Sequence, residues 1–530
     1  MSRLADIAVD AELEPIDLAF ADLIARLVVP HDSNLLARTA ALVSRELRSG
    51  HACVDLAEWS GRGLVNGSAV ETFPERAIWR RALRNSAIVG TGETVTPLVL
   101  DDADRCYLHR YWNAERRLAA RILAVCGDVL DDVDLASVAP RLAELFPQDP
   151  AAARGAPERP DWQAEAAKLA LHRRLAIVSG GPGTGKTTTV ARILALLLAA
   201  KRELRIELAA PTGKAAARLT ESIRAQAGAL PVDVELRRII GELEARTIHR
   251  LLGHGGGGGR FRHDSTRPLA CDVVIVDEAS MIDLLLMDSL LDAIPPHARL
   301  VLVGDKDQLA SVDAGFVYGD LCEASQAEGA LRGVAVELKN NWRFRERPGI
   351  EALATAVRAG DGDAAAAALA DPLLADATRA DPPADARAIV RQLDDEISAV
   401  VTAANADDAL AALSRFRLLC ATNRGPYGVE TLNYAMERHL RERGLVGGGD
   451  WYRGRPVLVT ANDYNVGLFN GDVGVCFPAA NGQIRVWFPT TESGLRAIVP
   501  ASLPPHVTAW AMTVHKSQGS EFDRVVVVLP

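Results

Sequence analysis

Short apolar runs recur along this chain, and each is followed by a glycine-rich or polar segment. They include Leu175–Ser179, Ile206–Ala210, Val273–Val276 and Leu300–Val303. Continuous runs of this length are typical of buried strands, and the Leu/Ala-rich segment Thr187–Ala200 has helical spacing. Units of strand, loop and helix that repeat in this way predict an α/β fold with parallel sheets, whose functional site lies at the carboxyl ends of the strands.

The first 150 residues have helical spacing instead. Ser33–Arg48 places its apolar side chains on one side of a helix, which Gly50 is expected to end. A second helix is predicted over Asp104–Val125, where Tyr and Trp alternate with Arg. That alternation is typical of a nucleic-acid surface, of a protein-docking face, or of a plain amphipathic helix. We expect Tyr107–Arg121 to be a docking surface, and the region shows no catalytic pattern.

The carboxyl-terminal part combines a low-complexity segment with strand patterns. Asp361–Asp385 is rich in Ala, Asp and Pro and predicts surface helices and a loop. Leu418–Ala421 predicts another buried strand. The hairpin signal Asn470-Gly471 favours a small β-barrel insert between about residues 436 and 506. Its short β-like runs are Val457–Thr460 and Val473–Cys476.

Composition narrows the class of protein. The chain has 530 residues, a length that corresponds to roughly three or four domains. Its hydrophobic fraction of 48% is enough to form their cores. Its formal net charge of −10 means that any nucleic-acid surface must be a local basic channel. Seven scattered cysteines without a C-x-x-C pair argue against disulfides or zinc and for a reducing cytoplasm. No signal peptide or membrane span is evident.

The segment LAIVSGGPGTGKTTT fits the phosphate-binding pattern G-x-x-x-x-G-K-[ST]. Its glycines let backbone N–H groups surround phosphate oxygens, and the helix N-terminus adds partial positive charge. Lys186 is expected to reach the β- and γ-phosphates of ATP, and the Thr187 hydroxyl to bind Mg²⁺. The predicted nucleotide-binding residues here are Gly180, Gly181, Pro182, Gly183, Thr184, Gly185, Lys186, Thr187 and Thr188.

Polar residues follow two further predicted strands. Asp277 is expected to hold Mg²⁺ together with Thr187, and Glu278 to orient the attacking water as a base. Gln308 is placed to sense the γ-phosphate, because an amide both donates and accepts hydrogen bonds. We interpret the neighbouring Asp305 as structural. Gln163, before the first strand, is a candidate reader of the adenine edge.

The segment PTGKAAARL follows the second predicted strand. Its Pro211, Thr212, Lys214 and Arg218 suit contact with a phosphate backbone, although a solvated first helical turn explains the same residues.

Taken in order, the P-loop, PTGK, TIH, VDEAS and GDKDQL segments resemble a superfamily-1 helicase. LKNNWRF resembles the family's motif with a γ-phosphate arginine, here Arg343. NDYNVGLFNGDVG and WAMTVHKSQGSEF are similar to the RecD family, the alpha subunits of exodeoxyribonuclease V, the RecBCD complex. HACVDLA and YLHRYW near the amino terminus add to this resemblance.

The resemblance implies an ATP-dependent 5′→3′ single-strand DNA translocase and helicase that acts at single- and double-stranded DNA ends. Its role is then double-strand break repair by recombination and degradation of linear DNA, with RecB- and RecC-like partner subunits. The implied domains are a helical docking domain over 1–150, RecA-like motor domains over 151–340 and over 341–435 with 507–530, and an SH3-like insert over 436–506.

The resemblance also implies site residues. Glu521 is expected near the nucleotide ribose. The candidate DNA contacts are Pro211, Thr212, Lys214, Thr247, His249, Thr513 and His515. No nuclease site or triad is evident, so exonuclease activity is expected from another subunit.

Two alternatives remain open at this point: a stand-alone helicase, and a DNA- and partner-binding subunit with weak ATPase activity. The chain stops at Pro530, directly after VVVVLP, where the family continues to one more motif with an arginine. From this we expect a fragment that binds ATP and Mg²⁺ and hydrolyses ATP poorly, because a trans-cleft arginine contributes about 10³–10⁵ in kcat in related systems.

Overall fold

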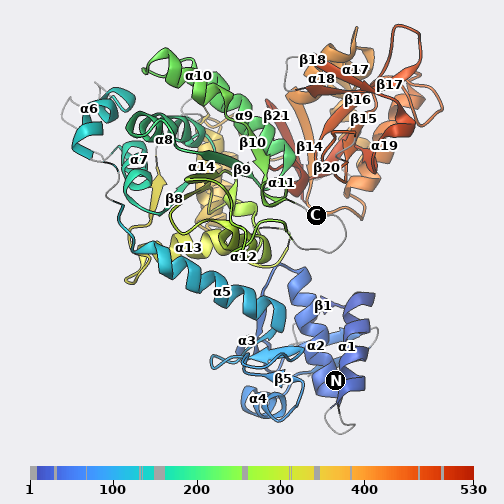
Figure 1. Ribbon diagram of the computed structural model, residues 1–530. Coiled ribbons are helices and arrows are strands. Elements are labelled where there is room, and N and C mark those ends of the chain that lie inside the picture. Colours follow the sequence, from blue (N-terminus) through green and yellow to red (C-terminus); the bar gives the residue numbers. More distant parts are fainter. Residues whose placement is uncertain are drawn as a thin grey trace. The chain divides into compact units, whose positions relative to one another are not determined.

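The computed structural model describes residues 9–28, 33–66, 69–130, 133, 135–147, 161–253, 261–309, 311, 313–339, 347–381, 385–463, 466–490 and 494–529. The predicted Arg343 and the glycine run 255–259 lie outside these residues. The chain forms two compact units, which are described separately below (Figure 1). The first contains residues 1–211, 226–243 and 248–342, and the second contains 212–225, 244–247 and 343–530.

The amino-terminal region contains the expected helices together with two small sheets that the sequence pattern did not predict. The sheet orders are β1-β3-β4 and β2-β7-β6-β5. The helices are α1 (Pro15–Leu27), α2 (Ser33–Arg48), α3 (Leu56–Trp59), α4 (Arg76–Arg84), α5 (His109–Cys126) and α6 (Leu135–Leu145). The strands are β1 (Val9–Glu12), β2 (Cys53–Asp55), β3 (Gly63–Asn66), β4 (Ala69–Thr72), β5 (Val89–Gly90), β6 (Leu98–Leu100) and β7 (Arg105–Leu108).

The helix predicted over Ser33–Arg48 is confirmed as α2, and Gly50 follows it with a φ of 93°. The helix predicted from Asp104 is wrong at its start, because α5 begins at His109. Residues 105–108 form β7, which pairs with β2 and β6 on its two sides. The backbone pairing of residues 105–108 with β2 and β6 outweighs their local helical spacing.

A six-stranded sheet forms the centre of the first unit, in the order β10-β9-β11-β12-β8-β13. The predicted strands are all present, and their described neighbours in the sheet are parallel. The strands are β8 (Leu175–Gly180), β9 (Ile206–Ala210), β10 (Ala245–Thr247), β11 (Val273–Val276), β12 (Arg299–Gly304) and β13 (Ala335–Leu338).

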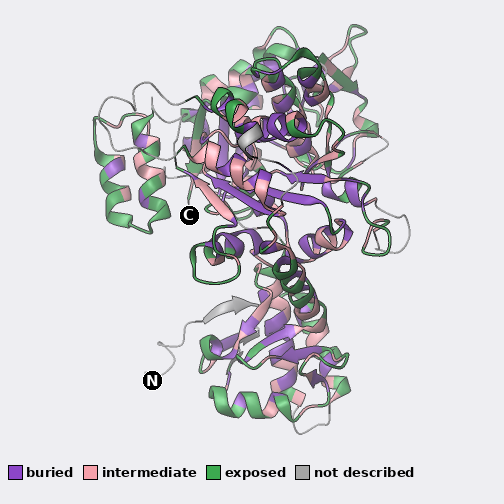
Figure 2. Cartoon of the chain, turned by 60° about the vertical axis from the view of Figure 1, so that its left-hand side comes forward, coloured by how far each residue is buried: buried purple, intermediate pink, exposed green. Residues whose placement is uncertain are grey.

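Helices cover this sheet, and its central strands β8, β11 and β12 are completely buried (Figure 2). The helices are α7 (Trp162–His172), α8 (Lys186–Ala200), α10 (Val234–Glu242), α11 (Ile248–Leu252), α12 (Leu284–Ala293) and α13 (Val317–Gln326). Helix α5 also contributes, because Ala114, Leu118 and Ile122 lie in the same core as β8 and β11. Helix α5 therefore connects the amino-terminal region to the core of the six-stranded sheet.

The second unit contains a three-stranded parallel sheet, in the order β20-β14-β21, and a five-stranded antiparallel sheet, in the order β18-β17-β16-β15-β19. The strands are β14 (Phe416–Cys420), β15 (Pro456–Val459), β16 (Val473–Pro478), β17 (Ile484–Thr490), β18 (Gly494–Ile498), β19 (His506–Thr508), β20 (Ala511–Thr513) and β21 (Arg524–Val528). The helices are α9 (Gly213–Ala227, most of which belongs to this unit), α14 (Pro348–Arg358), α15 (Gly362–Ala370), α16 (Ala386–Gln392), α17 (Asp394–Thr402), α18 (Ala406–Arg415) and α19 (Val429–Glu442).

The predicted β-rich insert corresponds to the antiparallel sheet, and its Asn470-Gly471 turn has a φ of 97° at Gly471. The expected boundary at residue 436 falls inside α19, so the β structure starts at Pro456. Among the described residues, no helix has the length and apolar character needed to cross a membrane.

Candidate functional site

The P-loop joins β8 to α8 and keeps its lysine close to the backbone. Gly183 and Gly185 have φ of 78° and 83°, values that favour glycine, and Gly185 is the N-cap residue of α8. Lys186 Nζ donates hydrogen bonds to the carbonyl oxygens of Gly180 and Gly181, at 2.6 Å and 3.2 Å. The ammonium group therefore lies over the loop whose N–H groups are expected to bind phosphate.

Gln163, in the first turn of α7, lies against this loop. Its Nε2 donates a hydrogen bond to the Thr184 carbonyl at 3.1 Å, and its Oε1 accepts one from Arg192 Nη1 at 3.0 Å. The structure thus brings Gln163 to the P-loop. Reading of an adenine edge by this amide remains a prediction, because both of its polar atoms are engaged by the protein here.

The acidic pair follows β11, and the P-loop follows β8, with β12 between these two strands. Burial raises the pKa of Asp277, while the backbone N–H of Glu278 and the charge of Lys186 lower it. The Glu278 N–H donates to Asp277 Oδ1 at 2.9 Å. Glu278 itself has a φ of 52°, a strained conformation for a non-glycine residue that is frequent at functional sites.

Gln308 follows β12 and is held by Asp305. Gln308 Nε2 donates to Asp305 Oδ2 at 3.2 Å, and the Asp307 N–H donates to Asp305 Oδ1 at 3.0 Å. Burial raises the pKa of Asp305, and Lys186 lowers it. We expected a structural role for Asp305 from the sequence. The structure agrees with this role, because the Asp305 carboxyl orients the amide of Gln308.

The donor set fits a magnesium ion that is bound together with a nucleotide. Thr187 lies in the first turn of α8, and Asp277 lies at the end of β11. In the described part of the chain, no cluster of three or more His, Cys, Asp and Glu side chains could hold a metal ion. One hydroxyl and one carboxylate are the protein ligands expected when phosphate oxygens and water complete the shell.

In the second unit, the segments that contain Lys214 and Ser520 meet. Lys214 Nζ donates to Ser520 Oγ at 2.5 Å, although the two residues are 306 positions apart. The pKa of Lys214 is lowered to about 8, chiefly by burial and also by the charges of Arg218 and Arg417, whereas Asp472 opposes this shift. This unit also contains further predicted site residues: Thr212, Thr247, Thr513, His515 and Glu521.

The remaining predicted DNA contacts, Pro211 and His249, belong to the first unit. The His249 ring contacts the Phe261 ring edge-on at 5.7 Å between ring centroids. The first unit therefore contains the predicted P-loop residues, acidic pair and Gln308, whereas the predicted DNA contacts are divided between the two units.

The docking surface expected at Tyr107–Arg121 stays a prediction, and several of its side chains make internal contacts. Tyr107 is buried in β7. Arg117 and Arg121 both form ion pairs with Asp288 of α12, and Arg121 also pairs with Asp292. These contacts give Tyr107, Arg117 and Arg121 a role in packing within the first unit.

Helix α1 presents the apolar surface that α5 lacks. Ile16, Leu23 and Leu27 are 59%, 53% and 56% exposed. Their spacing, with the partly buried Phe20 between them, places them on one face of the helix. Large exposed apolar stripes of this kind are typical of protein interfaces.

Two family descriptions match the chain. Residues 10–107 match the RecBCD enzyme subunit RecD, N-terminal domain, and residues 163–314 match the AAA domain. The second match covers the P-loop, the acidic pair and Gln308.

Comparison with individual relatives indicates the same family. The RecBCD enzyme subunit RecD of Mycolicibacterium smegmatis is 42% identical over 528 residues, which cover 98% of this chain and 88% of that protein. The subunit of the same name from Mycobacterium tuberculosis is 40% identical, covering 93% of this chain and 82% of its own length. The ATP-dependent RecD2 DNA helicase of Deinococcus radiodurans is 34% identical over 68% of this chain and 44% of that protein. The solved Pif1 helicase of Candida albicans covers 70% of this chain and 89% of its own at 17% identity, and its TM-score of 0.36 is too low to carry an argument.

Proposed function

Because the chain belongs to the RecD family of RecBCD enzyme subunits, we propose that it moves 5′→3′ along single-stranded DNA within a complex of RecB- and RecC-like subunits. It is an ATP-dependent DNA helicase subunit. The proposed setting is the bacterial cytoplasm, where the complex acts at double-stranded ends in recombinational repair and degrades linear DNA.

One observation carries the chemistry of this proposal: Lys186 lies within electrostatic reach of both Asp277 and Asp305, at the carboxyl ends of adjacent strands. In this arrangement Lys186 and the P-loop N–H groups bind the phosphates, and Thr187 and Asp277 hold Mg²⁺. The ion would neutralise charge on the phosphate oxygens. Glu278 orients the attacking water and accepts its proton.

Gln308 is the proposed sensor of the γ-phosphate. Asp305 orients its amide by one hydrogen bond, and an amide can both donate and accept hydrogen bonds to report the presence or loss of the phosphate. Arg343 is the proposed second cation, by the family resemblance alone. The proposed DNA contacts are the seven residues named above, from Pro211 to His515, and the proposed organisation is a docking domain followed by two motor domains and a β-rich insert.

A directional displacement assay tests the proposal. Streptavidin is bound to either the 3′ or the 5′ end of a biotinylated single strand, and the chain is added with ATP. We expect faster release from the 3′ end, and none by Glu278→Gln. Release from the 5′ end alone would contradict the direction, and equal release by Glu278→Gln would contradict ATP-driven movement.

A further inference from the structure

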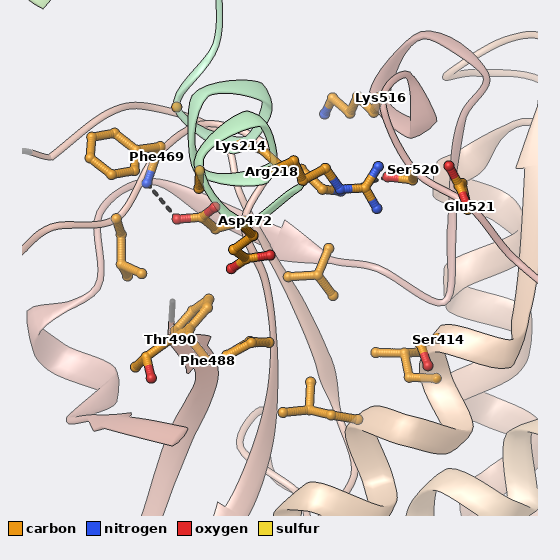
Figure 3. Close-up of a pocket in the computed structure, with 18 of the residues that line it drawn as sticks. Lys214, Arg218, Ser414, Phe469, Asp472, Phe488, Thr490, Lys516, Ser520 and Glu521 are labelled. Atoms are coloured by element: carbon orange, nitrogen blue, oxygen red, sulfur yellow. Dashed lines mark hydrogen bonds between the residues drawn. The ribbon is translucent and has the colours of Figure 1, made fainter. Parts of the chain in front are cut away.

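A pocket of about 610 Å³ lies within the second unit, and no P-loop residue lines it. It is lined by α9, α18, β14, β17 and the segment from Lys516 to Phe522 (Figure 3). Arg218 extends toward the side formed by Ser520 and Glu521, whereas Phe469, Phe488 and Thr490 lie on the other side. The volume falls in the range of about 300–1,000 Å³ that small-molecule sites occupy.

Cationic side chains dominate the charge of this pocket, although the whole chain is acidic. Five cationic side chains line it, and among the described residues none of them forms an ion pair with a carboxylate. The pocket's three carboxylates belong to Glu221, Asp472 and Glu521. The five cations are Lys214, Arg218, Arg417, Arg496 and Lys516.

Arg417 is the most informative of them, because it is only 3% exposed. Its Nη1 and Nη2 donate to the carbonyl oxygens of Ala509 and Leu413, at 3.1 Å and 3.4 Å, and its Nε has no hydrogen-bond partner among the described residues. Burial lowers its pKa to about 10. A buried guanidinium without a carboxylate is costly, which points to an anion that completes the site.

Lys214 adds a second, partly buried cation. Arg218 and Arg417 lie close enough to lower its pKa, so three positive charges converge on one region. Their mutual repulsion is unfavourable in the free protein, and a bound phosphate would relieve it.

The opposite wall is apolar and shaped by close packing. A Cβ atom on Gly213 would lie 2.6 Å from Cγ of Phe469, so glycine is needed for this ring to approach the start of α9. Phe488 is buried, and the Phe522 ring stacks with the Arg417 guanidinium at 4.9 Å. Aromatic rings beside cations are typical of sites where nucleobases stack.

We propose that this pocket binds one nucleotide, with its phosphate at Lys214, Arg218 and Arg417 and its base against the phenylalanine wall. The proposal rests on the proposed function, because Lys214 is also a candidate contact of the DNA strand. It adds Arg417 and the phenylalanines, which no DNA prediction included. The nucleotide comes either from the strand or from free mononucleotide released by DNA degradation.

Photocrosslinking distinguishes these sources. One probe is a short oligodeoxynucleotide with a central 5-iododeoxyuridine, and the other is 5-iododeoxyuridine monophosphate. Iodouracil crosslinks to aromatic side chains on which it stacks, so we expect crosslinks at Phe469, Phe488 or Phe522, mapped by mass spectrometry. If only the oligonucleotide crosslinks to these rings, the pocket binds the DNA strand. If the monophosphate crosslinks to them, the pocket binds free nucleotide.

Matched variants separate pocket binding from general charge. Arg218→Gln should lower the crosslink yield roughly tenfold, the effect of losing a hydrogen bond to a charged group. Arg224→Gln removes the same charge from the same helix outside the pocket and should have no effect. Crosslinks confined to other residues, or equal yields in both variants, would overturn the pocket while leaving the helicase function intact. A wild-type chain that binds no oligonucleotide would overturn both.

Discussion

Arg121 of α5 forms an ion pair with Asp288 of α12, 167 residues further along the chain. Arg117 of the same helix pairs with the same carboxylate. Helix α12 starts shortly after the Asp277-Glu278 pair, so the amino-terminal region is joined to the segment that carries the predicted catalytic acids. The helix that the sequence suggested for partner docking therefore holds the first unit together.

Asp288→Ala should lower the free energy of unfolding by about 1–3 kcal/mol, because two guanidinium groups lose their shared acceptor. Asp292→Ala, which removes an acceptor from Arg121 alone, should cost less. Denaturant unfolding of the full chain measures both. Equal stability of Asp288→Ala and wild type would show that α5 is held by its apolar face alone.

Partner docking should depend on α1. The double variant Leu23→Asp and Leu27→Asp places charge on the exposed apolar face and should abolish co-purification with the RecB- and RecC-like subunits. Val95→Asp is the control, because Val95 is 89% exposed in the same region but belongs to no apolar stripe. Complex formation that survives the double variant would place the docking surface elsewhere.

Single-strand binding should weaken as the pH rises through about 8. Only the protonated Lys214 attracts phosphate, and its lowered pKa of about 8 means that the charge is lost in that range. Lys214→Arg should bind DNA with little change over the same range, because a guanidinium stays charged. Fluorescence anisotropy at constant ionic strength measures this dependence. An identical pH dependence in Lys214→Arg would remove Lys214 from the DNA site.

Glu278→Gln should lower the rate of ATP hydrolysis by about 10²–10⁴, the usual contribution of a general base, while ATP binding is retained. The shape of the side chain is kept, so the strained backbone at this position is not disturbed. Glu203→Gln, an exposed carboxylate elsewhere in the first unit, serves as the control. A normal rate in Glu278→Gln would exclude Glu278 as the base.

Local patterns predicted the motor sheet well. The P-loop strand, the strand before Asp277 and the strand before Gln308 are buried runs with polar ends, and each lies where the sequence indicated. Their adjacency follows from parallel pairing, which the repeated strand–loop–helix units already implied. The position of the predicted ATP residues at the ends of these strands could therefore be anticipated from the sequence alone.

Features that depend on distant partners could not be predicted. Strand β7 exists because Tyr107 pairs with Cys53, and no local pattern in four residues reveals that partner. The sequence around Arg117 and Arg121 predicts solvent-exposed side chains, and only the structure shows that both pair with Asp288. Arg417 interrupts an apolar strand, and an isolated charge there suggests a side chain in water, whereas the structure buries it.

The most direct test of the central claim is the DNA-dependent part of the steady-state ATPase rate, measured for the wild-type chain and for Lys186→Ala. The account predicts that single-stranded DNA stimulates the wild type, whatever its absolute rate, and that Lys186→Ala shows no stimulation although it remains folded by circular dichroism. A stimulated rate in Lys186→Ala equal to that of the wild type would contradict the assignment of ATP hydrolysis to the P-loop.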